Sequence, residues 1–138
     1  MKLPFIALAV LLLALIGFAA WVRLAPSDLA RWHVSPSQGS LAPNKVNAET
    51  GGATLLLPDI SLAQMDAVAM ATPRTARFAG SEDEGRITYI TRSALWGFPD
   101  YTTVQSTPEG LLLHARLRFG ESDMGVNAAR LRDWQSRL

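Results

Sequence analysis

Side chains suited to binding an anion lie on two neighbouring β-strands predicted for residues 98–106 and 111–118. Because side chains alternate between the two faces of a strand, His114, Arg116 and Arg118 share one face. Guanidinium groups bind carboxylates and phosphates through paired hydrogen bonds, so this face could hold a small anionic ligand or a lipid headgroup. The alternative is an ordinary sheet face in water, with cross-strand side-chain pairs.

The turn between these two strands determines which side chains meet. A four-residue turn at residues 107–110 has Pro and Gly where turns use them. It pairs Tyr101 with Arg116 and Thr103 with His114. We therefore expect a phenol, an imidazole and several guanidinium groups to gather on one polar face.

A second candidate site is the loop that leads into the last predicted helix. It carries two glycines, a Ser-Asp pair and, further on, an Asn and an Arg: Gly120, Ser122, Asp123, Gly125, Asn127 and Arg130. Either Ser122 or Asp123 can cap the helix, and Asn127 and Arg130 are spaced so that their side chains meet. The loop is either a rigid corner between strand and helix or a polar pocket at a helix N-terminus, which favours anions.

The two sites together define one set of candidate binding residues. They are Arg92, Tyr101, His114, Arg116, Arg118, Ser122, Asp123, Asn127 and Arg130.

The sequence contains little that would support catalysis. The chain has no Cys, which excludes thiol enzymes, cysteine-bound metals and disulfides. The two histidines, His33 and His114, lie on different predicted elements, so we expect no metal and no cofactor. Ser, His and Asp are present without a G-x-S-x-G elbow. A net charge of +1 without a basic stripe predicts no nucleic-acid binding.

The loop sequence resembles the signature of domain of unknown function 1499, a family found in bacteria and plant plastids. The likeness rests on an Arg-x-Gly-x-Ser-Asp-x-Gly-x-Asn-x-x-Arg run over residues 118–130 and on a Gly-Phe-x-Asp element at residues 97–100. It covers residues 60–138, and the chain departs from the family pattern at Leu117 and Ala128. The resemblance implies a small membrane-linked or exported domain and no known activity.

The N-terminus carries an uncharged run over residues 3–22. As a helix this run would span about 30 Å, the thickness of a bilayer's hydrocarbon core. Trp21 at its end suits the headgroup region. The alternative is a secretory signal peptide cleaved after Ala19. We expect an uncleaved single-pass anchor at residues 1–23 in a bacterial inner membrane, with the rest of the chain in the periplasm.

The remaining chain divides into a tether and a domain. Residues 24–58 are rich in Pro, Gly, Ser and Asn without a clear period, which predicts one helical turn capped by Ser27 and then an irregular tether. Residues 59–138 predict an α+β domain that begins with a capped helix at Ser61. Four strands joined by short turns and a last helix follow. We expect a four-stranded antiparallel sheet with two helices packed on it.

These features favour a non-enzymatic accessory or interaction subunit of a larger membrane or envelope complex. The alternative is a binding module for an anionic small molecule or lipid headgroup, using the arginine-lined face. Guanidinium groups that converge on one pocket would favour binding, and groups splayed into solvent would favour the interaction role.

Overall fold

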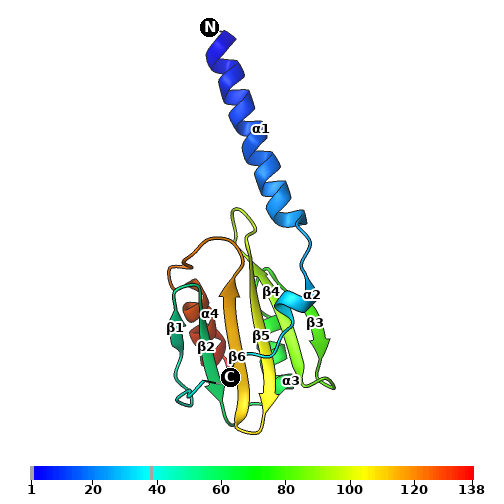
Figure 1. Ribbon diagram of the computed structural model, residues 1–138, viewed down its shortest axis with the longest axis vertical. Helices are drawn as coiled ribbons and strands as arrows, with labels where there is room; N and C mark the ends of the chain where they lie inside the picture. The colour runs from blue at the N-terminus through cyan, green and yellow to red at the C-terminus, as the bar shows by residue number, and fades with distance from the viewer. Residues whose placement is uncertain (1, 38) are drawn as a thin grey trace.

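A long N-terminal helix stands on one end of a sheet with two helices on its back in the computed structural model, which describes residues 2–37 and 39–138 (Figure 1). In chain order the elements are α1 (Lys2–Leu24), α2 (Leu29–Trp32), β1 (Asn47–Glu49), β2 (Gly52–Leu57), α3 (Leu62–Met70), β3 (Thr75–Ser81), β4 (Arg86–Arg92), β5 (Pro99–Thr107), β6 (Gly110–Leu117) and α4 (Val126–Ser136). The predicted α+β class is confirmed.

The sheet has six strands in the order β1-β2-β6-β5-β4-β3, and all neighbours are antiparallel. The prediction of four strands is therefore wrong. The two additional strands, β1 and β2, come from residues that the composition predicts to be an irregular tether. They extend the sheet beyond β6, so the chain before residue 58 forms one edge of the domain.

Burial explains why β2 shows no strand period. Ala53, Leu55 and Leu57 are buried in the core, and Thr54 on the other face is 7% exposed. A strand covered on both faces does not alternate between apolar and polar residues. Gly52 also weakens the sequence signal, yet a Cβ there would lie 2.3 Å from the Ala115 carbonyl oxygen of β6. The close pairing of β2 with β6 therefore requires glycine at this position.

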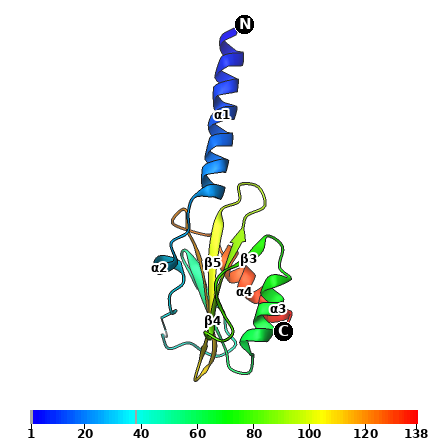
Figure 2. The ribbon, with the colours of Figure 1, turned by 90° about the vertical axis from the view of Figure 1, so that its right-hand side faces the viewer.

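The sheet separates two different layers. Figure 2 shows α3 and α4 on one face and α2, with the chain around it, on the other face. Two helices on one face agree with the prediction. The outer face of the sheet, opposite α3 and α4, is the face on which the polar strand residues were predicted to gather.

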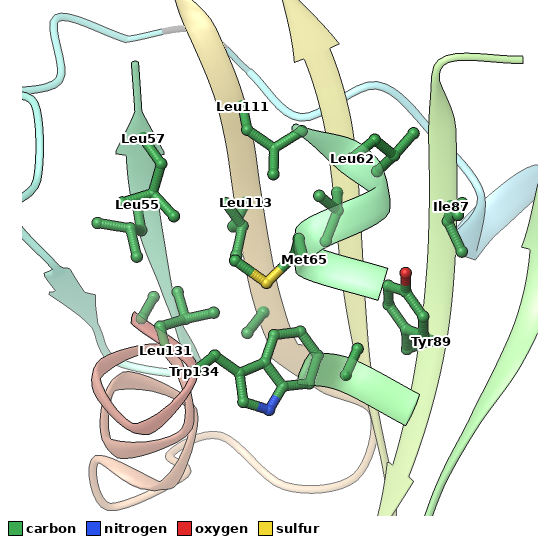
Figure 3. Packing of buried hydrophobic residues seen from close by; sticks show 14 of the residues in the cluster. Leu55, Leu57, Leu62, Met65, Ile87, Tyr89, Leu111, Leu113, Leu131 and Trp134 are labelled. Carbon is green, nitrogen blue, oxygen red and sulfur yellow. The ribbon is translucent and has the colours of Figure 1, made fainter. Parts of the chain in front are cut away.

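The core lies between the sheet and the two helices (Figure 3). Trp134 of α4 and Met65 of α3 are fully buried against Leu113 of β6 and Tyr89 of β4. The Trp134 and Tyr89 rings meet edge to face, with centroids 5.8 Å apart. This packing fixes α4, and with it the loop that precedes α4.

Helix α3 is held at both its start and its middle. The predicted capping box is confirmed, with the Gln64 amide N–H donating to Ser61 Oγ and the Ser61 N–H donating to Gln64 Oε1. Asp66 accepts hydrogen bonds from Arg77 and from the Tyr89 hydroxyl at 2.7 Å. The Arg77 hydrogen bond outweighs burial and holds the pKa of Asp66 below its usual value.

Helix α1 is exposed over almost its whole length, with a mean hydropathy of 2.8 over its most apolar window. By length and composition it could cross a membrane, and a signal sequence would meet the same criteria. Near its end Ala19 is half-buried, and Val22 is completely buried where the helix meets the domain.

Candidate functional site

The linker, which we define as residues 24–37, crosses the outer face of the sheet. Its short helix α2 is capped by Asp28, whose carboxylate accepts from the Ala30 amide at 2.9 Å, rather than by Ser27 as the sequence predicts. Trp32 at the end of α2 is 6% exposed and stacks on Tyr101, with centroids 4.0 Å apart and planes 8° apart. The predicted polar face is thus covered by the chain's own linker.

The strand register brings the predicted side chains together. Tyr101 lies opposite Arg116 and Thr103 opposite His114, which confirms the predicted pairing. Arg116 donates to the Trp32 carbonyl oxygen and to Thr103 Oγ1, the second at 3.1 Å. Burial lowers the pKa of Arg116 to about 10, so its guanidinium group stays charged at neutral pH.

Two further predicted arginines bind the chain where α1 ends. Arg118 donates to the Pro26 carbonyl at 3.0 Å and to the Tyr101 hydroxyl at 3.3 Å. Arg92 donates to the Gly97 carbonyl at 2.9 Å and to the Arg23 carbonyl at 3.3 Å. The last carbonyls of a helix lack partners within the helix and carry its negative dipole end, so a cation there is favourable. The guanidinium groups therefore bind main-chain oxygens of this chain.

A second set of contacts holds the linker further along and was not foreseen from the sequence. His33 Nδ1 lies 2.8 Å from Thr88 Oγ1, and Arg86 donates to Ser35 Oγ at 2.7 Å. The one sequence signal for this docking is Trp32, a large aromatic residue in a polar segment, which is favoured where it can be buried.

The His114 side chain contacts β1 rather than the linker, while its carbonyl accepts from Arg116 at 3.0 Å. Its Nε2 lies 3.8 Å from Glu49 of β1, and its pKa is lowered by burial and by the charge of Arg116. Its position on the outer face agrees with the prediction.

The loop before α4 forms a hydrogen-bonded corner. Asp123 accepts from the Gly125 amide at 3.0 Å and from the Asn127 amide at 2.9 Å. The N-cap of α4 is Gly125, in a left-handed conformation and without a side-chain cap, so the predicted cap at Ser122 or Asp123 is wrong, although Asp123 holds the first turn from two residues earlier. Burial raises the pKa of Asp123, but these hydrogen bonds outweigh burial and the net pKa is lowered. Arg130 donates to Asn127 Oδ1, as the spacing predicts, and pairs with Asp100 of β5 at 3.2 Å.

A small cavity of about 150 Å³ lies between this corner and the loop between β4 and β5. It is lined by Ser93, Phe98, Asp100, Leu117, Phe119, Ser122, Asp123 and Val126. Burial raises the pKa of Asp100, and the nearby Asp123 adds to the rise, while Arg130 opposes it. The two serine hydroxyls of this lining each accept a hydrogen bond from the main chain of their own loop. Ser93 Oγ accepts from the Phe98 amide, and Ser122 Oγ accepts from the Met124 amide.

Aromatic side chains join the end of α1 to these same loops. Phe18 of α1 lies 6.0 Å from Trp96 and 6.1 Å from Phe98, measured between ring centroids. Trp21 of α1 meets Phe119 edge to face at 5.4 Å. The two loops that carry the Gly-Phe-x-Asp element and the Ser-Asp pair therefore contact one side of the last turns of α1, which stay largely exposed.

A further cavity, of about 310 Å³, lies away from the predicted site residues. It is lined by Gly39, Ser40, Leu41, Leu56, Glu109 and Leu112. Within residues 2–37 and 39–138, no group of three or more His, Cys, Asp or Glu side chains is placed to hold a metal ion.

The fold and the site define a small α+β domain whose outer sheet face binds the linker of an N-terminal apolar helix. A family model described as protein of unknown function (DUF1499) matches residues 34–138, which include all six strands, α3 and α4. The chain belongs to this family, which confirms the resemblance found in the loop sequence. The comparison with curated proteins finds no match.

Proposed function

We propose that the chain is a membrane-anchored, extracytoplasmic accessory protein, which acts as a non-enzymatic interaction subunit of a larger membrane or envelope complex. The observation that carries this proposal is the binding of residues 23–32 to the sheet by Arg92, Arg116 and Arg118. These contacts, with the complete burial of Val22, make the end of α1 part of the folded domain. A helix integrated in this way supports a retained anchor rather than a removable leader.

The use of the polar groups supports an interaction role over catalysis. The serine hydroxyls beside the 150 Å³ cavity accept hydrogen bonds from main-chain amides of their own loops, and Asp123 accepts from two amides at the start of α4. By contrast, α1 exposes long apolar side chains along its length, which is typical of a helix surrounded by lipid or by other helices. A Cβ added at Gly17 would meet nothing within 4 Å, so a partner helix can approach closely at this point.

A second candidate function is the binding of an anionic small molecule or lipid headgroup. It is favoured by the convergence of Arg116 and Arg118 near Tyr101, where both bind oxygen atoms. In the present conformation carbonyl oxygens of the linker occupy these donors, so an anion would have to displace the linker. This cost makes anion binding the weaker of the two candidates.

Purification of the full chain in mild detergent, followed by mass spectrometry of co-purifying proteins, tests the first proposal. We expect a stoichiometric membrane protein partner that is lost when Gly17→Leu fills the close-approach position. The matched control is Leu15→Ile on the opposite face of α1, which we expect to keep the partner. A chain that purifies alone and releases its linker on titration with phosphate would instead establish the second candidate.

A further inference from the structure

Apolar side chains lie on the two loops that contact the foot of α1. We call them the rim, which consists of the half-buried Trp96 and Phe119 and the exposed Leu95, Met124 and Val126. Leu95 is 78% exposed, Met124 92% and Val126 51%. Single apolar residues on a surface are ordinary, but here several gather at one end of the domain on two separate loops. Both views show the loop between β4 and β5 rising beside the last turns of α1 (Figures 1 and 2).

The aromatic contacts give the height of the two loops along α1, since Phe119 of the loop before α4 meets Trp21 and Trp96 of the loop between β4 and β5 meets Phe18. Trp96 lies 6.0 Å from Phe18, which precedes Arg23 by five residues. A helix rises 1.5 Å per residue, so the Phe18 Cα lies about 7 Å before Arg23 along the axis. Helical side chains also lean towards the N-terminus, which carries the Phe18 ring further in that direction. The loop between β4 and β5 thus reaches back beside the apolar part of α1.

We propose that the rim lies in the interfacial layer of a lipid bilayer, as a second membrane contact besides α1. This rests on the proposed retention of α1 as an anchor. If α1 spans the bilayer, side chains level with Phe18 lie no further from the bilayer centre than the end of the span. The occupant of the rim is therefore lipid, because the rim is continuous with the lipid-exposed surface of α1.

The chemistry of the rim fits this layer. Residues 93–98 carry no charged side chain, and Trp is favoured at membrane interfaces. The loop before α4 has one exposed carboxylate, Glu121, three residues before Met124, which limits the contact to shallow insertion. Arg23 donates to the Leu95 carbonyl at 3.2 Å and so places a cation at the level of the lipid phosphates. The domain is then held at two separate points, the helix and the rim.

The absence of cysteine makes site-specific labelling direct. An environment-sensitive fluorophore is attached to Leu95→Cys and, separately, to Met124→Cys of the full chain in nanodiscs of phosphatidylethanolamine and phosphatidylglycerol. Both side chains are exposed, so neither label disturbs the core. The matched control is Asp83→Cys in the exposed turn between β3 and β4, at the end of the domain away from α1.

We expect the labels at Leu95 and Met124 to shift their emission to the blue and to lose most of their fluorescence to lipids that carry a quencher near the headgroup. The label at Asp83 stays sensitive to aqueous iodide alone. Equal iodide sensitivity at all three positions overturns the rim proposal and leaves the anchor proposal intact. The mass of the purified chain, measured before labelling, shows separately whether α1 was retained. A chain that has lost α1 overturns both the anchor proposal and the rim proposal.

Discussion

Replacement of Trp32 tests whether the linker is bound to the sheet in solution. The ring is 6% exposed and stacks on Tyr101 at 4.0 Å. A buried Trp removes about 150 to 250 Å² from water, and at about 25 cal/mol per Å² this corresponds to at least about 4 kcal/mol. Because an unfolded chain already hides part of this area, we expect Trp32→Ala to lower the free energy of unfolding by about 3 kcal/mol.

Urea unfolding of the full chain in mild detergent, followed by far-ultraviolet circular dichroism, measures this loss. For a urea slope of about 2 kcal/mol per M, the midpoint falls by about 1.5 M with the slope unchanged. The matched control is Leu29→Ala in the same short helix, where the side chain is 56% exposed and the expected change is below about 0.5 kcal/mol. Equal midpoints for Trp32→Ala and the unaltered protein would show that the linker does not dock on the sheet.

Three further predictions concern other parts of the fold. Gly97→Ala, at φ 76° and with its Cβ 2.9 Å from Arg23 Nε, costs about 1 to 2 kcal/mol in the same urea experiment. Asp123→Ala removes two amide hydrogen bonds at the start of α4 and costs about 1 kcal/mol, seen also as faster amide exchange at Asn127. The pKa of His114 is lower in the folded state than its unfolded value of 6.5. Its contribution to stability is therefore complete above pH 6.5 and is lost as the pH falls through the folded-state pKa. His114→Asn removes this part of the pH dependence, and an unchanged pH profile would contradict the assignment.

Local patterns predicted much of the fold. The alternation of side chains along residues 98–118 correctly placed Tyr101 opposite Arg116. The two-residue period of the strands and the length of the turn between them together set the register of strand pairing. The capping box at Ser61 and the contact between Asn127 and Arg130 were also predictable, since each depends on residues three positions apart.

Features that depend on distant contacts were not predictable. Strand β2 forms because β6 offers a partner edge about sixty residues later in the chain, and its burial on both faces removes the period. The linker covers the outer face of the sheet because Trp32 stacks on Tyr101, and no rule of sequence spacing predicts a contact between these two residues. The arginines were correctly placed on one face, but the sequence could not show that their nearest acceptors are the chain's own carbonyls.

The most direct test of the central claim, that α1 is retained as an anchor joined to the sheet, is the mass and location of the chain in cells. Membranes are washed with alkaline carbonate, and the protein in each fraction is measured intact. We predict the full 15.0 kDa chain, with Lys2 and the rest of α1 present, in the washed membranes. A shorter chain that begins after Ala19 and appears in the soluble fraction would contradict the account.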